Sequence, residues 1–318
     1  MRAIAIREFG GRDRLQLVDL DKPVPETDDV LVRVVAAGVN PVDWKIREGW
    51  LQEKFPHRFP LIPGWDVAGI VEETGPGVTG FEPGDGVYAY CRKPVVQGGA
   101  YAEYVTVPAK AVAPKPRTLC FEEAAGVPLA ALTAFQAIVD AGGVKCGDSV
   151  LVQGASGGVG SFAVQFAADL GAEVLGVASA WNRDYLASRG VRHPIDYRAD
   201  DVAKVVRDLC PGGVDVIFDC VGGNVLTASA ALLKDGGRLV SILDPGTLDS
   251  LRGRGIDASY VFVEPDACQL RHIGEMIDAG RVRTYLSAVL PLEEAARAHE
   301  RVESQHVRGK IVLRVGTP

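Results

Sequence analysis

The first 115 residues carry short hydrophobic runs that alternate with polar residues and turn signals. Four of these runs are rich in β-branched residues and lie at 2–9, 28–38, 65–75 and 100–108. Stretches rich in Gly and Pro, such as ETGPG and EPGDG, separate them, which is typical of short strands joined by turns. We therefore predict a compact, partly closed antiparallel barrel, interrupted near residues 40–50 by a short helix that Pro41 opens.

Beyond residue 119 the pattern changes to alternating helices and strands. Residues 121–142 are rich in alanine and predict one helix that ends at two glycines. Strands are then predicted at 148–154, 172–179, 213–223 and 236–243, with helical stretches between them. Alternation of this kind predicts an α/β fold in which helices cover both faces of a doubly wound parallel sheet.

The end of the chain returns to the first pattern, with a helix predicted at 292–304 and a strand at 310–315. We expect this C-terminal piece to pack onto the N-terminal domain. The predicted domains are a discontinuous β-rich domain, formed by 1–118 and 266–318, and a parallel-sheet domain formed by 119–265. The 318 residues are sufficient for two domains of this size.

Composition limits the classes of partner. The net charge of −7 argues against nucleic acid and anionic membranes, because both select basic patches. No run of about 18 apolar residues occurs, so no transmembrane helix is expected, and the charged N-terminus is typical of a strand and not of an export signal. The six cysteines lack the close spacing of disulfide scaffolds and zinc sites. We expect reduced thiols in a cytoplasmic protein.

The stretch from 149 to 179 combines a strand, a glycine turn, a helix and a second strand. Small residues at such a turn let the backbone approach a pyrophosphate, whose charge then meets the N–H groups at the start of the helix. A purely structural tight turn is the alternative. We predict a dinucleotide site here, formed by Gly154, Ser156, Gly157, Gly158 and Val159, with Gly160 letting the helix lie close to the sheet.

The end of the second predicted strand indicates which dinucleotide binds. Enzymes that hold the adenosine ribose hydroxyls place Asp or Glu there, and this chain instead has Ser179 followed by Ala, Trp and Asn. Arg183 can pair with a 2′-phosphate, and Tyr197 follows the next helix. A solvated side chain is the alternative for Arg183. The missing acid predicts NADP(H) rather than NAD.

Motifs along nearly the whole chain resemble those of a known family. They include AAGVNPVDWKIREG, PGWDVAGIVEETGPGV, GGAYAEYVTVP, AAGVPLAALTAFQA, VLVQGASGGVG and HVRGKIVLRV. The family is the medium-chain dehydrogenase/reductase superfamily, in its zinc-independent quinone oxidoreductase branch, which includes zeta-crystallin. The resemblance implies a GroES-like catalytic domain built from both ends of the chain, a central Rossmann domain, a cleft between them and a homodimer.

Zinc-dependent relatives offer a negative test of this branch. They place a Cys at the position of Asn40 and a His-Glu pair at the positions of Trp65 and Asp66. Their structural zinc lobe needs four cysteines near residues 90–110, where only Cys91 is present. Asn and Trp are poor zinc ligands. We therefore predict that the protein holds no metal.

The resemblance also assigns site residues. Asn40, Asp43 and Lys45 are predicted near the reacting groups, and the remaining cofactor contacts fall at Thr133, Cys220, Val221, Phe262, Val263 and Lys310. Each has a structural alternative. Asn40 can cap the short helix and Asp43 can be its first-turn acid. Lys45 can be a solvated side chain, Thr133 a hydroxyl bonded within its helix, and Lys310 a charge on an edge strand.

These residues predict an oxidoreductase that uses NADPH to deliver hydride to an electron-poor small molecule. Without a Lewis acid such an enzyme is suited to a quinone or an α,β-unsaturated carbonyl, and the proton can come from water. The DWK and GWD segments favour the alkenal-reducing and plastid-type members. Two alternatives are a zinc-type alcohol dehydrogenase and a noncatalytic, crystallin-like NADPH-binding protein.

Overall fold

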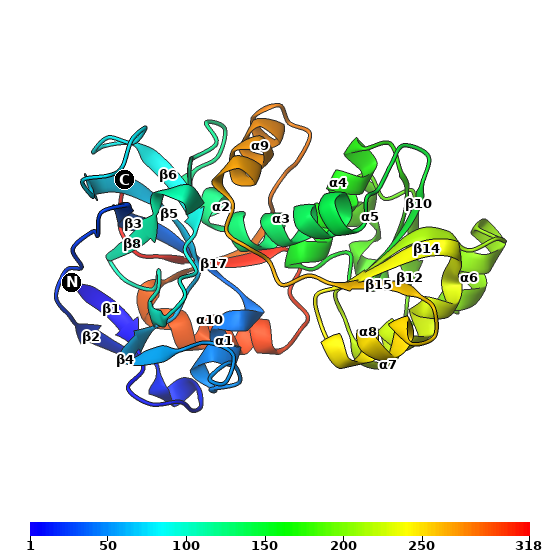
Figure 1. The fold of residues 1–318 in the computed structure, drawn as a ribbon, viewed down its shortest axis with the longest axis horizontal. Coiled ribbons are helices and arrows are strands. Elements are labelled where there is room, and N and C mark those ends of the chain that lie inside the picture. Colours follow the sequence, from blue (N-terminus) through cyan, green and yellow to red (C-terminus); the bar gives the residue numbers. More distant parts are fainter. The chain divides into compact units, whose positions relative to one another are not determined.

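The computed structural model describes residues 1–318, and its helices and strands fall into two units (Figure 1). The first unit comprises Met1–Leu129 and Pro265–Pro318, and the second comprises Ala130–Glu264. The first crossing lies beyond the predicted residue 118 because helix α2 (Phe121–Ala125) packs on the strands of the first unit. No helix in the structure is long and apolar enough to cross a membrane.

The first unit is built on a seven-stranded sheet. The strand order is β16-β17-β3-β5-β6-β9, with β8 also pairing with β3. Its strands are β3 (Asp29–Val39), β5 (Asp66–Thr74), β6 (Gly86–Tyr90), β8 (Tyr104–Pro108), β9 (Val112–Pro114), β16 (Leu286–Pro291) and β17 (Lys310–Arg314). All pairs are antiparallel except β16–β17. Because β17 pairs with β3, the C-terminal segment completes the N-terminal sheet, as predicted.

Two small ribbons and four helices complete this unit. The ribbons pair β1 (Arg2–Ala5) with β2 (Gln16–Asp19) and β4 (His57–Ile62) with β7 (Val96–Gly98). Besides α2, the helices are α1 (Pro41–Arg47), α9 (Ala267–Asp278) and α10 (Ala295–Glu303), and α1 packs against α10. Helix α1 confirms the predicted opening at Pro41.

The second unit contains a six-stranded, fully parallel sheet. The order is β12-β11-β10-β13-β14-β15. The strands are β10 (Ser149–Gln153), β11 (Glu173–Ala178), β12 (His193–Asp196), β13 (Val214–Asp219), β14 (Leu233–Ser241) and β15 (Asp257–Tyr260). The chain moves from β10 to one edge and then returns to build the other side from β13. This reversal makes the gap between β10 and β13 the topological switch point, where ligands bind in such sheets.

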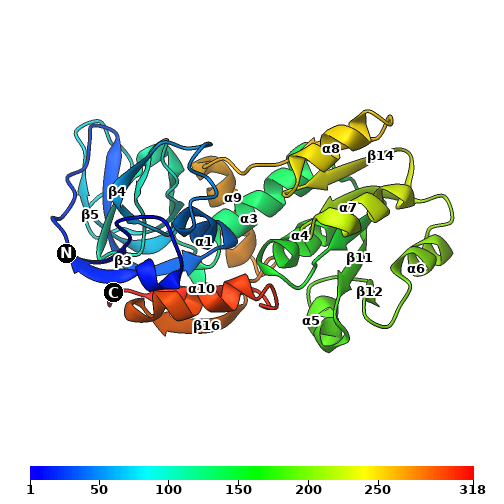
Figure 2. The same cartoon turned by 90° about the horizontal axis from the view of Figure 1, so that it is seen from below.

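Helices cover both faces of this sheet, as predicted (Figures 1 and 2). Helices α4 (Gly158–Asp169) and α5 (Arg183–Ala187) lie on one face. Helices α6 (Val202–Leu209), α7 (Gly223–Ser229) and α8 (Pro245–Arg252) lie on the other and bury apolar side chains against the strands. Helix α8 lies beyond the last strand predicted for this unit, in a stretch for which we predicted no element.

The helix predicted over 121–142 is divided into three pieces. Helix α2 ends before Gly126, and α3 (Pro128–Phe135) begins at a proline, whose fixed φ suits the first turn of a new helix. From Gln136 to Ala141 the winding changes to a π-helix. The alanine-rich composition predicted the helical state, but it did not reveal these two interruptions.

Candidate functional site

The glycine turn lies at the switch point and has a geometry that only glycine allows. After β10 the chain turns at Gly154 with φ of +72°, and the Gly157 N–H donates to the Gly154 carbonyl at 3.0 Å. A Cβ on Gly160 would lie 2.3 Å from that carbonyl oxygen. The turn therefore requires glycine at 154 and 160, and it leads into α4, whose first N–H groups have no acceptor within the helix. Ser156, Gly157, Gly158 and Val159 lie at this helix start, as predicted.

The loop after β13 forms the other side of the switch point. A Cβ on Gly154 would lie 3.3 Å from a methyl of Val221 and 3.5 Å from the Cβ of Cys220, so the two loops are in contact. The buried carboxylate of Asp219 accepts the N–H groups of Val221 and Gly222, both at 3.1 Å. Burial raises the pKa of the Cys220 thiol, so Cys220 carries no thiolate.

Asp219 is a residue that our sequence analysis missed. Besides fixing the loop, it accepts the hydroxyl of Ser241 on β14 at 2.7 Å. The signal was present in the sequence, because an acid at the end of a buried strand, directly before the Cys-Val-Gly-Gly segment, needs several donors to be stable. Asp219 therefore holds in place the two residues, Cys220 and Val221, that we had singled out.

The carboxyl ends of β11 and β12 bring together the residues predicted to recognise a 2′-phosphate. Ala178 pairs with Asp196, so Ser179 and Tyr197 follow at neighbouring strand ends. The Ser179 hydroxyl accepts the Asn182 amide at 3.1 Å. Arg183 is exposed at the start of α5 and makes no ion pair. Its guanidinium is thus available to an anion.

Arg198 is a second cation at this end of the sheet that sequence reasoning missed. Its Nε lies 3.3 Å from the Tyr197 hydroxyl, and its guanidinium carbon lies 5.6 Å from the centre of the Tyr197 ring. Both side chains are exposed. Its position directly after Tyr197 was the available signal. The strand ends therefore offer two arginines and no acid at the Ser179 position.

Thr133, Phe262 and Val263 also lie in the second unit. Thr133 is buried in α3. Phe262 and Val263 directly follow β15, and the side chain of Val263 is buried. The backbone N–H and C=O of Val263 make no hydrogen bond in the structure. An amide group with this donor and acceptor pair is complementary to a carboxamide.

In the first unit, Asn40, Asp66 and Lys310 form a buried polar cluster. The Asn40 amide donates to Asp66 at 2.8 Å, and the Lys310 ammonium donates to the side-chain oxygen of Asn40 and, at 3.1 Å, to the carbonyl of Val39. Lys310 and Asp66 form an ion pair at 3.6 Å. The second Asp66 oxygen accepts the N–H of Leu129 at 2.7 Å. Lys310 is thus buried on a central strand and is not an edge charge.

Asp43 belongs to an adjoining buried chain of hydrogen bonds. Its Oδ2 accepts the Asn40 N–H at 2.8 Å and the Tyr101 hydroxyl at 3.0 Å. Tyr101 lies 3.3 Å from Nε2 of His299, whose Nδ1 lies 3.2 Å from Arg47. Because a guanidinium only donates, Nδ1 of His299 accepts and its proton lies on Nε2. Each group in this chain therefore donates a hydrogen bond to the next, from Arg47 through His299 and Tyr101 to Asp43.

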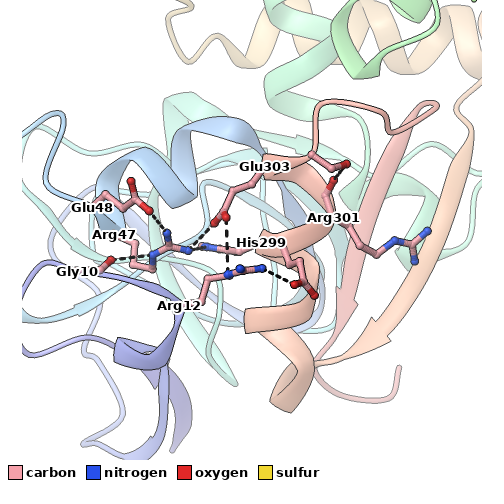
Figure 3. A network of polar contacts seen from close by, with 9 residues as sticks. Gly10, Arg12, Arg47, Glu48, His299, Arg301 and Glu303 are labelled. Atoms are coloured by element: carbon pink, nitrogen blue, oxygen red, sulfur yellow. Dashed lines mark hydrogen bonds and ion pairs between the residues drawn. The ribbon is translucent and has the colours of Figure 1, made fainter.

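Arg47 anchors this chain where α1 meets α10 (Figure 3). It is fully buried and donates to Gly10 at 3.0 Å, to Glu303 at 2.8 Å and to Glu48. Arg12 extends the network with ion pairs to Glu300 at 2.8 Å and to Glu303 at 3.7 Å. Desolvation, together with the neighbouring arginines, lowers the pKa of His299 to about 3, so its imidazole is neutral. The network fixes α1, which carries Asp43 and Lys45.

These contacts revise the roles of the three residues predicted near the reacting groups. Asn40 and Asp43 are 2% and 0% exposed and bind neighbouring groups of the protein. Asn40 is the N-cap residue of α1, and Asp43, in the first turn, accepts the Asn40 N–H. Lys45 differs from both residues. Burial lowers its pKa, and no ion pair raises the pKa again. Its ammonium lies 5.7 Å from the centre of the Trp44 ring, which packs edge-on against Trp50.

Comparison with known proteins identifies the family. The chain matches the alcohol dehydrogenase GroES-like domain over residues 26–117 and the zinc-binding dehydrogenase model over 189–313. It is 34% identical to the quinone oxidoreductase of Rattus norvegicus over 98% of this chain and 97% of that protein. The chain belongs to the medium-chain dehydrogenase/reductase superfamily. The predicted family and the combination of a GroES-like domain with a Rossmann-type sheet are thus confirmed.

Solved structures of this superfamily agree. The quinone oxidoreductase of Coxiella burnetii has a TM-score of 0.90 and 33% identity, with 99% of both chains covered. A mycobacterial protein whose structure contains NADPH has a TM-score of 0.86 and 30% identity, covering 99% of this chain and 100% of that one. This protein is therefore an oxidoreductase of a pyridine-nucleotide-dependent superfamily.

The zinc that one family description names does not fit the residues present here. At the relatives' ligand positions, the side-chain oxygens of Asn40 and Asp66 are already in contact with the Lys310 amine. Trp65 is buried and packs edge-on against Phe55 and Tyr90. The structure contains no group of three His, Cys, Asp or Glu side chains suited to a metal ion.

Proposed function

We propose that the protein is an NADPH-dependent reductase of quinones or α,β-unsaturated carbonyls. The observation that carries this proposal is the pairing of a glycine-only turn at the switch point with two arginines at the neighbouring strand ends. The turn fits the pyrophosphate of a dinucleotide. The arginines fit a 2′-phosphate, which NADPH carries and NADH lacks.

The proposed cofactor contacts follow from these positions. The first N–H groups of α4, from Gly158 onward, would hold the pyrophosphate. Ser179, Arg183 and Arg198 would hold the 2′-phosphate, with Tyr197 beside the adenosine. The backbone of Val263 would bind the nicotinamide carboxamide. Cys220 and Thr133 are the remaining proposed cofactor contacts, and both side chains are uncharged. Bound NADPH supplies a hydride, and the protein orients it toward an electron-poor carbon.

Lys45 is the side chain we propose for contact with the acceptor. It carries a half-buried ammonium without an ion pair, beside the rings of Trp44 and Trp50. Such a group can donate a hydrogen bond to the carbonyl oxygen that becomes negative as hydride arrives. The aromatic side chains suit a flat, conjugated acceptor. Asn40 and Asp43 would act indirectly, by holding the start of α1.

The test is oxidation of NADPH and NADH over a panel of 1,4-quinones and 2-alkenals after treatment with EDTA. We expect faster turnover with NADPH, at least one active acceptor class, and no loss of rate after EDTA. Activity restricted to saturated ketones, aldehydes or alcohols would contradict the proposal. Tight NADPH binding without turnover of any acceptor would instead favour a noncatalytic binding protein.

A further inference from the structure

The side chain of Gln136 forms a clasp of two hydrogen bonds with Glu264, the last residue of the second unit. The chain enters this unit after Leu129 and returns to the first unit at Pro265. Within the second unit, the Gln136 side chain donates to the carbonyl of Glu264 at 2.9 Å and accepts the N–H of Glu264 at 3.0 Å. One side-chain amide thus binds both polar groups of a backbone residue 128 positions away.

The helix that carries Gln136 changes its winding at this residue. Helix α3 is α-helical up to Phe135, and the π-helix begins at Gln136. In this stretch the Gly142 N–H donates to the carbonyl of Ala137, five residues earlier, at 2.8 Å. π-helical turns are rare and occur often at functional sites. Thr133, a proposed nicotinamide contact, lies one turn before the clasp on the same helix.

The clasp restrains the segment that precedes it. Val261 is fixed because its N–H donates to the carbonyl of Ser241 on β14 at 2.9 Å. Glu264 is fixed by Gln136, so Phe262 and Val263 are held from both ends. Val263 is the residue whose backbone N–H and C=O make no hydrogen bond. The orientation of its backbone therefore depends on these two restraints together with the packing of its buried side chain.

We infer that Gln136 is a positioning residue that aligns the backbone of Val263 with the nicotinamide carboxamide. This inference rests on the proposed function, because it requires a bound dinucleotide. The physical reason is geometric: hydride transfer falls steeply when the reacting groups are misplaced by about 1 Å. Gln136 acts through Val263 and does not itself contact the reacting atoms.

The test compares the wild-type protein with Gln136→Met, which keeps the length of the side chain and removes both hydrogen bonds. The probes are NADPH and 2′,5′-ADP, which carries the 2′-phosphate but no nicotinamide. We expect the single-turnover rate of hydride transfer, from NADPH to a quinone or 2-alkenal that is active in the panel above, to fall about tenfold or more in this variant. The Kd for 2′,5′-ADP should stay within about twofold, because its proposed contacts lie at the other end of the dinucleotide.

Two further variants complete the design. Gln165→Met removes another glutamine amide of the same unit, which donates to the Ser161 carbonyl at 2.7 Å, and should leave both quantities unchanged. Gln136→Glu keeps the acceptor and loses the donor, so its rate should be intermediate, and it decides the question if Gln136→Met does not fold. An unchanged rate, or equal weakening of both ligands, overturns the inference. Wild-type protein that binds neither ligand overturns the proposed function itself.

Discussion

Arg183 and Arg198 are exposed side chains whose proposed partner is the 2′-phosphate of NADPH. Arg183→Ala and Arg198→Ala should each raise the KM for NADPH about tenfold, since a hydrogen bond between charged groups contributes about 1.5–3 kcal/mol. The KM for NADH should change less than about twofold, because NADH presents no charge there. Arg207→Ala, on the exposed surface of α6, is the control. Equal effects on both dinucleotides would remove these arginines from the phosphate site.

Asp43 is the residue whose burial most directly predicts a pH dependence of stability. Desolvation raises its pKa from 3.8 to about 7, and nearby Asp66 adds to the rise. The Asn40 N–H, the Tyr101 hydroxyl and Lys310 act in the opposite direction, because they favour the carboxylate. Between these two pKa values the folded protein keeps a proton that the unfolded chain has lost.

The free energy of unfolding should therefore fall as the pH rises from about 4 to about 7, by up to about 4 kcal/mol from this group alone. Asp43→Asn does not titrate and should lack this contribution. Urea denaturation of both proteins at pH 4, 5, 6, 7 and 8 measures the difference. His299, whose pKa is lowered to about 3, stays neutral across the range. A difference between the two proteins that is constant with pH would refute this account.

At the scale of elements, the sequence predicted what local chemistry controls. The strand, turn and helix from 149 to 169 were predicted because glycine positions, apolar runs and helix starts leave direct traces in a sequence. The π-helix at Gln136–Ala141 was not predicted, and helix α8 was missed although Asp244 caps it and Pro245 opens it, both of which are local signals. Helix α8 begins after Asp244, which has a left-handed φ of 50° that no composition rule predicts.

The residues of the candidate site also divide into those that the sequence predicts and those that it does not. The glycine turn, Ser179 and Arg183 were predictable because each lies at a fixed distance along the chain from a recognisable strand end. The burial of Asn40 and Asp43 was not predictable, because their partners Lys310 and Tyr101 lie far away in sequence. Long-range polar contacts therefore decide whether a recognised residue faces a ligand or holds the protein together.

At the scale of the whole molecule, Lys310 connects the two ends of the chain within the first unit. Its strand β17 pairs with β3, and its ammonium binds Asn40 and the buried carboxylate of Asp66. Lys310→Met should lower the free energy of unfolding by about 3–5 kcal/mol, because it leaves a charged group buried without its partner. Urea denaturation at pH 7 measures the change.

A matched double substitution separates this charge effect from loss of packing. Adding Asp66→Asn to Lys310→Met removes the unpaired charge, so the double variant should regain part of the lost stability. Lys204→Met breaks the exposed Lys204–Asp208 pair and should change stability by less than about 1 kcal/mol. The single variant Asp66→Asn closes the cycle: if Asp66→Asn costs as much stability in Lys310→Met as it does in the wild-type protein, the ion pair contributes nothing of its own. The closure of the discontinuous unit would then depend on the β17–β3 hydrogen bonds and the apolar side chains of the sheet.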